Sequence, residues 1–497
     1  MTAQIGYFSL VAAMLVGIYA TVMPIVGLKL KRKDIIVSGE RAAISVAGLM
    51  LASTGALLYA FLSRDFSIKY VYEYSNRALS TIYTISSWWA GNQGSLLMWA
   101  VFLSIYAAIA ILLNRHKNRD MMPYVTTILS ALILFFTALI VFMANPFVKM
   151  PYIPADGQGL NPMLHNPGMY MHPPATYLGY VGFAIPFAFA MAALLSGKLG
   201  DMWIRTTRRW AIWGWLWLTV GNLVGAWWAY YTLGWGGFWG WDPVESASFM
   251  PWLVGTAYLH SVMIQEKKGM LKIWNMALIT ITFSLTIYGT LITRSGIINS
   301  VHTFSQSGLG PYLMFMLLSV MFLGFGLILY RLPMLKTENE LDSIVSRESA
   351  FLFNNLILLG IAFMVLWGVT FPFISEVVTG NKITVGPPFY NQMAVPLGLA
   401  LLFLMGFCPL IAWRRASVAN LQRNFIYPLS SAFAGFFVLE LIGIRKPWAI
   451  AAFVLVIFVV STIILEFYRG TKARHKMTDE DILTAFINLI WRNKRRY

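Results

Sequence analysis

The stretch YVTTILSALILFFTALIVFMAN, residues 124–145, decides the fold class, because it runs for 22 residues without a charged side chain. A helix needs about 20 mostly apolar residues to cross the hydrocarbon core of a bilayer. The segment before it, 114–123, carries three Lys and Arg residues, whereas the longer segment after it, 146–173, carries one. This difference in basic charge is typical of a membrane span whose basic end faces the cytoplasm.

The same pattern recurs along the 497-residue chain, of which 58% is hydrophobic and only 11% charged. This composition excludes a soluble globular enzyme, a disordered protein and a solenoid. We predict an all-α polytopic membrane protein with about 13 transmembrane helices, forming a single membrane domain over residues 1–497. The predicted spans are 5–28, 42–62, 95–113, 124–145, 174–195, 210–228, 250–265, 273–292, 311–330, 351–374, 393–413, 425–444 and 447–468.

The loops between these spans alternate in basic charge. One set carries 29 of the 37 Lys and Arg residues, and the other set carries 8. The positive-inside rule then places the N-terminus outside and the C-terminus in the cytoplasm, with 469–497 as a basic cytoplasmic tail. The net charge of +17 is therefore expected to reflect membrane topology, and no nucleic-acid partner is expected.

Two absences narrow the chemistry. Cys408 is the only cysteine, so the chain cannot form an internal disulfide, a CxxC redox pair or a thiolate metal site. The sequence also has no GxxxxGK[ST] motif for nucleotide phosphates. The first span is not a secretory signal, because its basic residues follow the apolar run. Any chemistry is expected on the outer face and within the helices.

The outer segment 229–249 reads AYYTLGWGGFWGWDPVESASF and has no Lys or Arg. An aromatic belt at the membrane interface is the simplest interpretation, but a belt spreads its aromatic residues over many helix ends. Here Trp235, Phe238, Trp239 and Trp241 fall within seven residues, among glycines that let the backbone approach a ligand closely. A platform for a flat apolar ligand fits this segment better, and the tryptophan-rich segment is taken as residues 229–250.

Three histidines are candidates for ligands of heme iron, which imidazole commonly coordinates. His172 and His302 lie in separate outer segments and could hold the iron from opposite sides. His260 lies near the middle of the span 250–265, where an ionisable group is a functional hypothesis by default. A hydrogen-bonded structural histidine is the alternative for each one alone. The remaining histidines are expected to be structural or solvated: His116, His165 and His475.

Two charged candidates, Asp242 and Glu245, lie within the tryptophan-rich segment, and a third, Arg294, lies in a later segment. Asp242 precedes Pro243 as at a typical helix start, so Asp242 and Glu245 are expected to shape the turn more than to catalyse. Arg294 follows the eighth span and could neutralise a heme propionate, which suits the guanidinium geometry. Anchoring at the membrane interface is an equal alternative for Arg294.

Five motifs in order resemble the CcmF family, the membrane heme lyase component of cytochrome c maturation, which is related to the heme-handling protein CcsA. WGGFWGWDPVE (235–245) resembles the family's WWD motif. Two others resemble its periplasmic histidine segments, LNPMLHNPGMYMHPPATYLGYVG (160–182) and LITRSGIINSVHTF (291–304). PWLVGTAYLHS (251–261) is similar to its membrane histidine segment, and KITVGPPFYN (382–391) is similar to another family stretch. The resemblance runs from near residue 76 to the C-terminus.

The resemblance implies thioether formation between the vinyl groups of heme and the CxxCH thiols of an apocytochrome c. It implies the heme chaperone CcmE and thiol-reductase or chaperone subunits of the CcmH and CcmI type as partners, in a bacterial or archaeal inner membrane with a periplasmic active face. It makes His172 and His302 the periplasmic heme ligands, and His260 an axial ligand of a b-type heme that quinol reduces. The heme platform it implies consists of Trp235, Trp239, Trp241 and Asp242.

The chain departs from the family at three places. Phe238 stands where the family often has tryptophan, and Asn92-Gln93 stands where many members have His-Glu. The family also has a second membrane histidine downstream, but only His475 follows His302 here. We therefore expect a split maturation protein, in which a second polypeptide supplies the missing ligand.

Three alternatives remain at this point. The first is a paralogue of the same family dedicated to one multiheme cytochrome, as in nitrite reductase assembly. The second is a heme transporter, which predicts a polar cavity across the bilayer and matched repeats. The third is a proton-pumping respiratory subunit, which needs several ionisable mid-span residues, whereas the sequence offers only His260.

Overall fold

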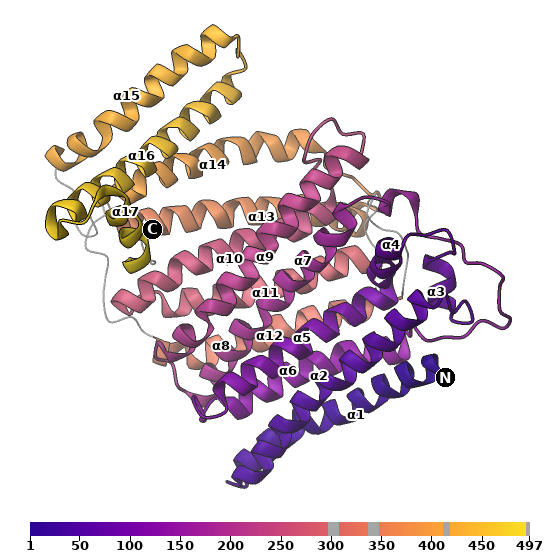
Figure 1. Ribbon diagram of the computed structural model, residues 1–497. Coiled ribbons are helices and arrows are strands. Elements are labelled where there is room, and N and C mark those ends of the chain that lie inside the picture. The colour runs from indigo at the N-terminus through magenta and orange to yellow at the C-terminus, as the bar shows by residue number, and fades with distance from the viewer. Residues whose placement is uncertain (297–307, 336–346, 411–417, 494–497) are drawn as a thin grey trace. The chain divides into compact units, whose positions relative to one another are not determined.

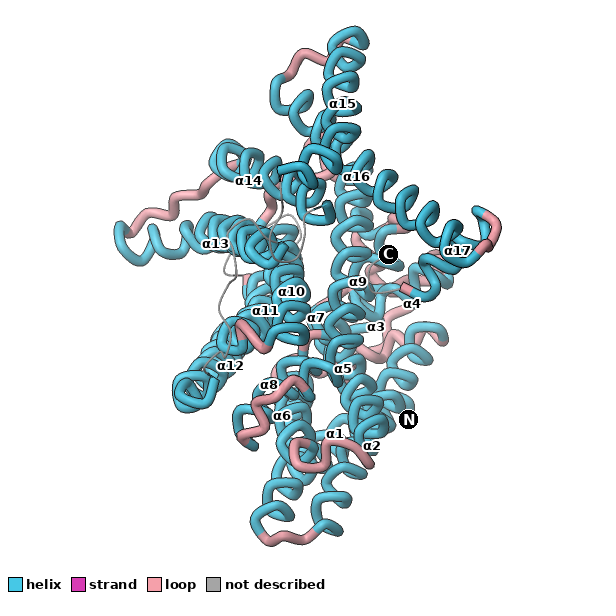
Figure 2. The backbone as a smooth tube through the Cα atoms, turned by 90° about the vertical axis from the view of Figure 1, so that its left-hand side faces the viewer, coloured by secondary structure: helices cyan, strands magenta, loops and turns pink. Residues whose placement is uncertain are grey.

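The computed structural model describes residues 1–296, 308–335, 347–410 and 418–493. Within these ranges the chain is helical, and its only strand-like feature is an isolated bridge between Ile68 and Lys149. Figure 2 shows helices joined by loops throughout. His302 lies outside the described residues.

The chain divides into two compact units. The first comprises 1–338 and 365–387, and the second comprises 339–364 and 388–497, so the long helix α13 (Arg347–Thr379) contributes to both. The prediction of a single membrane domain stays a prediction. The other helices of the first unit are α1 (Thr2–Lys29), α2 (Lys33–Leu62), α3 (Lys69–Tyr74), α4 (Thr81–Ser86), η1 (Ser87–Trp89), α5 (Asn92–Asn114), α6 (Met122–Phe142), η2 (Pro162–Leu164), α7 (Gly168–Gly182), α8 (Ala184–Ser196), α9 (Met202–Thr232), α10 (Pro243–Lys268), α11 (Lys272–Ser295), α12 (Gly310–Arg331) and η3 (Leu332–Leu335).

In the described residues, eleven helical segments are long and apolar enough to cross a membrane. The α-helical membrane class is thereby confirmed. Two further predicted spans, 210–228 and 250–265, fall within α9 and α10, which have 31 and 26 residues. Both helices exceed the roughly 20 residues that a span requires, but they are too polar to be recognised from hydropathy alone. The number of 13 spans and their orientation stay predictions.

Small residues allow the N-terminal helices to pack closely. The buried positions of α1 recur every three or four residues and are mostly Gly or Ala, the pattern that brings membrane helices into backbone contact. A Cβ atom at Gly39 of α2 would lie 2.7 Å from the ring of Pro24 of α1. Side-chain volume therefore fixes how α1 and α2 meet.

A buried ion pair ties α2 to the loop between α5 and α6. The Nη1 atom of Arg119 lies 2.8 and 3.0 Å from the two carboxylate oxygens of Glu40. The Glu40 side chain is 5% exposed, whereas that of Arg119 is 34% exposed. Since a buried charge is expensive without a partner, Glu40 depends on this arginine.

Glycine contacts also join α7 to α9. A Cβ atom at Gly182 of α7 would lie 2.7 Å from the Cα atom of Gly214 of α9. A Cβ atom at Gly179 would lie 2.6 Å from the Leu218 side chain of α9. These contacts fix α7 along α9 and so determine where the first turns of α7 lie.

Hydrogen bonds between side chains join α9 to α10. The indole Nε1 atoms of Trp215 and Trp252 donate to Thr256 and Thr219, each over 2.8 Å. These two hydrogen bonds pair polar side chains of α9 with polar side chains of α10. Figure 1 shows α7, α9, α10 and α11 running side by side in the middle of the first unit.

The other helices of the second unit are α14 (Pro387–Phe407), η4 (Cys408–Leu410), α15 (Val418–Ile442), α16 (Pro447–Thr478) and α17 (Ile482–Arg492). Stacked rings of Phe407, Phe425 and Phe458 form its core. The segment 469–497, expected as a basic tail, is largely helical, because α16 continues to Thr478 and α17 follows.

Candidate functional site

The tryptophan-rich segment forms a loop, 233–242, between the end of α9 and the start of α10. The loop turns sharply at two places with left-handed backbone, Gly236 at a φ of 68° and Trp241 at a φ of 57°. Glycine adopts this conformation readily, but for other residues it costs roughly 1–2 kcal/mol. The conformation at Trp241 must therefore be held by neighbouring contacts.

Two acids hold the loop against α10. The Asp242 side chain accepts a hydrogen bond of 3.0 Å from the amide of Val244 and caps the helix. The Glu245 carboxylate accepts hydrogen bonds from the amides of Gly240 at 3.1 Å and Asp242 at 3.4 Å. These bonds form a capping box, which is the structural role expected for both acids.

The rings of the loop pack on the first turns of α10. Trp239 meets Trp241 edge to face with centroids 5.7 Å apart, and Phe249 lies 5.4 Å from Trp239. Trp235 covers the loop backbone, because a Cβ atom at Gly240 would lie 2.6 Å from its ring. Trp239 and Trp241 thus form one aromatic cluster with Phe249 of α10.

A cavity of about 150 Å³ lies beneath this loop. Its wall comes from one end of the first unit: η1 and η2, α7, the end of α9, the start of α10 and the end of α11. The residues that define it are Trp89, His172, Tyr177, Asn222, Trp228, Trp239, Glu245 and Arg294. The structure therefore brings together His172, Trp239 and Arg294 from separate parts of the sequence. The other candidates described, Trp235, Trp241, Asp242 and His260, do not line this cavity.

His172 lies on α7 with its ring fixed from two sides. Its Nδ1 atom lies 2.8 Å from the carbonyl oxygen of Gly221 on α9, and its ring meets Trp228 edge to face with centroids 5.9 Å apart. A carbonyl oxygen only accepts hydrogen bonds, so Nδ1 carries the proton and Nε2 carries the lone pair. Metal-binding histidines typically show this arrangement, in which the second nitrogen is oriented by a carbonyl.

Arg294 brings positive charge to the cavity from the last turn of α11. Its Nη2 atom donates to the Tyr177 hydroxyl over 3.0 Å, and its Nη1 atom donates to the Asn92 side-chain oxygen over 3.3 Å. These bonds orient the guanidinium from α7 and α5. The position suits an anionic group of a ligand, one of the two roles predicted for Arg294.

Two wall residues, Trp89 and Trp228, were not predicted as site residues. The indole of Trp89 donates to the carbonyl oxygen of Met169 over 3.1 Å, just before His172 on α7. The signal in the sequence was the adjacent pair Trp88-Trp89 ahead of a glycine, and the pair Trp227-Trp228 at the end of α9. Both pairs are clusters of tryptophan, as in the segment 229–249.

His260 and His165 lie elsewhere. Ser248, Trp252 and Thr256 recur every four residues on α10, and each bonds to or packs on α9. His260 is one step further along the same face, about 22 Å from Glu245 along the helix axis. His165 stacks on Tyr83 and its Nε2 atom lies 3.2 Å from the Leu160 carbonyl oxygen, as a structural histidine would.

The residues that line the cavity match a porphyrin chemically, but the cavity is too small to enclose one. An imidazole with its lone pair on Nε2, indole faces and a guanidinium match the iron, the ring and the propionates of heme. However, pockets for ligands of drug size usually measure about 300–1,000 Å³, and this cavity is smaller. A macrocycle bound at His172 must extend beyond the cavity or displace the loop 233–242.

The family model described as "Cytochrome C assembly protein" matches residues 89–298, a range that contains the whole cavity wall. Cytochrome c-type biogenesis protein CycK of Rhizobium meliloti is 39% identical over 84% of this chain and 62% of its own length. Cytochrome c-type biogenesis protein CcmF of Escherichia coli is 36% identical over 90% of this chain and 68% of its own length.

A solved structure titled "Cytochrome c Heme Lyase CcmF" has 27% identity and a TM-score of 0.77, over 99% of this chain and 76% of that one. The chain thus spans about two thirds of the length of these curated relatives. The expectation of a split form finds no support in these matches. The extent and identity of the similarity show that the chain belongs to the CcmF family of cytochrome c-type biogenesis proteins.

Proposed function

We propose that this chain is a heme lyase component of cytochrome c maturation. It receives heme from the chaperone CcmE on the outer face and promotes attachment of the heme to the CxxCH thiols of an apocytochrome c. The observation that carries this proposal is the pairing of His172 with the Gly221 carbonyl oxygen at a cavity walled by tryptophans. The relatives named for cytochrome c biogenesis and heme lyase activity support it.

The reaction joins each cysteine sulfur to a vinyl carbon of heme, and the thiol proton ends on the neighbouring vinyl carbon. Addition of this kind consumes no external oxidant. The substrate supplies both thiols, because Cys408 is the only cysteine of the chain. The task of this chain is therefore to orient the heme, hold its iron and exclude water, which lowers the barrier by pre-positioning the reacting groups.

Each role falls to a residue at the cavity. His172 binds iron through Nε2, and Arg294 pairs with a propionate. The indoles of Trp89, Trp228 and Trp239 cover the ring and exclude water. From the family resemblance, His302 is the second iron ligand, and Trp235, Trp241 and Asp242 complete the platform.

His260 is proposed to bind a separate heme b within the membrane, and this heme is proposed to receive electrons from quinol. Its position about 22 Å from Glu245 along the α10 axis supports a site apart from the outer cavity. Subunits of the CcmH and CcmI type are proposed to deliver the apocytochrome.

The proposed topology has 13 spans, with the N-terminus outside and the C-terminus in the cytoplasm of a bacterial or archaeal cell. Every helix end that lines the cavity falls on the outer side by this assignment. The cavity then faces the periplasm, where an exported cytochrome is accessible. This gathering at one end disfavours a transporter, which needs a path through the bilayer. A dedicated nitrite reductase paralogue is not favoured either, since the NrfE relative matches no better than CcmF relatives do.

The test is production of a c-type cytochrome in a host that lacks its own CcmF and carries this chain with the host's other maturation proteins. Covalently bound heme is measured by heme stain after denaturing electrophoresis. His172→Ala and His302→Ala are expected to abolish the stain while the chain still inserts in the membrane. His116→Ala is the control. This residue lies in the basic run after the last turn of α5, whereas the cavity lies near the first turn of that helix. Unchanged staining with His172→Ala would refute the ligand role.

A further inference from the structure

The helix α17 combines a polar stripe with a broad apolar surface. Its sequence is ILTAFINLIWR, and its polar residues Thr484, Asn488 and Arg492 recur every four positions. Residues at this spacing share one side of a helix. The rest of the helix is apolar, which is unusual for a segment outside the predicted spans.

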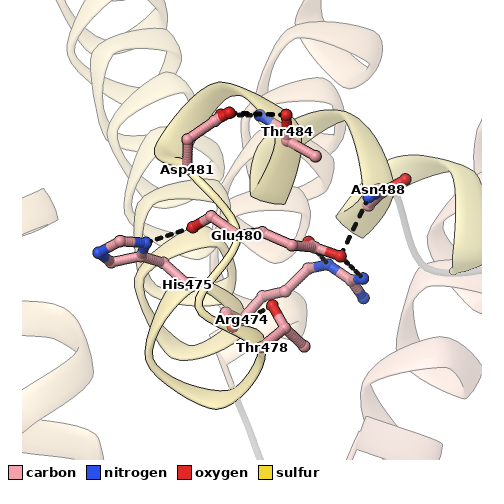
Figure 3. A network of polar contacts seen from close by, with 7 residues as sticks. All are labelled: Arg474, His475, Thr478, Glu480, Asp481, Thr484 and Asn488. Carbon is pink, nitrogen blue, oxygen red and sulfur yellow. Dashed lines mark hydrogen bonds and ion pairs between the residues drawn. The ribbon is translucent and has the colours of Figure 1, made fainter.

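A turn with a network of polar contacts connects α17 to α16, as Figure 3 shows. Asp479 reverses the chain with a φ of 52°. The guanidinium of Arg474 donates from Nε and Nη2 to the two carboxylate oxygens of Glu480, over 2.7 and 2.8 Å. The Asn488 amide donates to the same carboxylate over 3.2 Å. The turn is thus tied to both helices.

The start of α17 is also capped. Asp481 accepts hydrogen bonds of 2.7 Å from the amide and from the hydroxyl of Thr484. The backbone bond lowers the pKa of the Asp481 carboxyl. A capped helix with a fixed entry turn holds one orientation relative to α16.

One side of α17 packs on α16 and the opposite side does not. Ala485 and Leu489 are buried, and the Phe486 ring lies 5.7 Å from that of Phe467. On the other side, Leu483 and Trp491 are both 69% exposed. Ile487 lies between them and is 54% exposed. We call Leu483, Ile487 and Trp491 the outer strip of α17.

We propose that α17 lies flat in the interfacial region of the membrane leaflet at the end of α16, with the outer strip among lipid chains and the adjacent basic residues on anionic headgroups. The helix has 11 residues and is about 16 Å long, too short to cross a bilayer. The predicted span within α16 ends at residue 468, and the contact between Phe486 and Phe467 places α17 on α16 at that membrane border.

Charge favours lipid as the occupant. The segment 469–497 has eight Lys and Arg residues against three acids. Four of the basic residues follow the outer strip directly: Arg492, Lys494, Arg495 and Arg496. Basic residues beside an amphipathic helix attract an anionic leaflet, and tryptophan favours the headgroup level. The proposal does not depend on the heme chemistry proposed above.

The test measures the depth of single cysteines in the full chain reconstituted in nanodiscs that contain anionic lipid. Cys408→Ala first removes the only native cysteine. Leu483→Cys and Ile487→Cys then place a spin label on the outer strip, and Thr484→Cys places one on the exposed polar stripe as the matched control. Collision rates with oxygen, which enters lipid, and with a water-soluble nickel chelate are measured by electron paramagnetic resonance.

Labels at 483 and 487 are expected to show a severalfold higher ratio of oxygen to nickel collisions than the label at 484. A high nickel rate at 483 and 487 would overturn the proposal, because the strip would then face water. Low rates with both reagents would overturn it too, because the strip would be buried against protein. Combined Lys494→Gln, Arg495→Gln and Arg496→Gln should lower the ratio at 487 severalfold, and an unchanged ratio would refute the role of anionic headgroups.

Discussion

The Nδ1 atom of His172 on α7 lies 2.8 Å from the carbonyl oxygen of Gly221 on α9. This bond crosses between helices that are 49 residues apart at these positions. It sets the tautomer of the imidazole and aims its other nitrogen by the packing of two long helices. The proposed iron ligand is therefore positioned by the bundle and not by a loop.

Gly225→Ala should disable the site by displacing the His172 ring. A Cβ atom at 225 would lie 2.6 Å from the Nδ1 and Cε1 atoms of His172, so the imidazole must move and its bond to Gly221 must break. Loss of such an orienting bond typically lowers metal affinity about 10–100-fold. We expect a matching loss of heme binding in purified protein and of covalent cytochrome in cells.

The control for that variant is Gly48→Ala on α2, where a Cβ atom meets nothing within 4 Å. Alanine is favoured over glycine inside a helix by roughly 0.5–1 kcal/mol, so this variant should keep full activity and insertion. Normal cytochrome yield from Gly225→Ala would show that the orientation of His172 is irrelevant to the reaction.

Arg294 should tolerate substitution in a graded order. Arg294→Gln removes the charge that we assign to a propionate, whereas Arg294→Lys keeps it and loses the planar fork that reaches Asn92 and Tyr177. We expect the yield of covalent cytochrome to fall in the order wild type, Lys, Gln. Tyr177→Phe removes one bond to the guanidinium and should give a smaller defect than Gln.

A heme analogue without propionate charge separates this role from simple anchoring. With the dimethyl ester of heme, purified wild type and Arg294→Gln should bind equally well, because the charged partner of the guanidinium is absent. If Gln still binds the ester much more weakly than wild type, Arg294 supports the fold of the cavity and does not pair with a propionate.

The sequence predicted the helices well where apolar runs are long, as in α6, because hydropathy measures the drive to enter lipid. It placed the ends less well where polar residues continue a helix beyond the bilayer. The predicted span 447–468 is the clearest case, since α16 runs on through a basic segment to Thr478. Hydropathy does not predict such an extension. A helix keeps its backbone hydrogen bonds when it continues into water, and no apolar run marks that part of it.

The candidate site was predicted in part. His172, Trp239 and Arg294 were chosen from separate motifs, and the structure places all three at one cavity. Trp89 was missed because its place in the wall depends on a hydrogen bond to Met169, 80 residues away. Contacts of this kind follow from the packing of η1, just before α5, against α7, which no local pattern encodes.

The turn between α16 and α17 should loosen in acid. The hydrogen bonds that Glu480 accepts from Arg474 hold the pKa of the Glu480 carboxyl below the ordinary value of 4.5. The stabilisation is fully present above that value and is lost as the pH falls through the lowered pKa of Glu480. Spin labels on α16 and α17 should therefore move apart only at strongly acidic pH.

Glu480→Gln is the matched variant for that titration. It keeps the size of the side chain but cannot ionise, so the distance between the labels should be the same at pH 7 and in acid. The same acid transition in Glu480→Gln and in wild type would assign it to another group, and Asp481, whose pKa is also lowered, would be tested next.

Breaking the Glu40–Arg119 pair from its two sides should have unequal effects on stability. Arg119→Gln leaves the carboxylate of Glu40, with its side chain 5% exposed, without its cation, and a buried polar group that loses its partner costs about 1–3 kcal/mol. Glu40→Gln leaves only a guanidinium that is 34% exposed and can turn to water. The apparent unfolding temperature in detergent should therefore fall by several degrees for Arg119→Gln and less for Glu40→Gln. The double variant should be less damaging than the sum of the two, since neither charge of the pair remains.

The neighbouring pair Lys198–Asp120 provides the control, because its side chains are 57% and 74% exposed and exposed pairs contribute little. Equal shifts for Asp120→Asn and Arg119→Gln would mean that burial of Glu40 does not govern the stability of this corner.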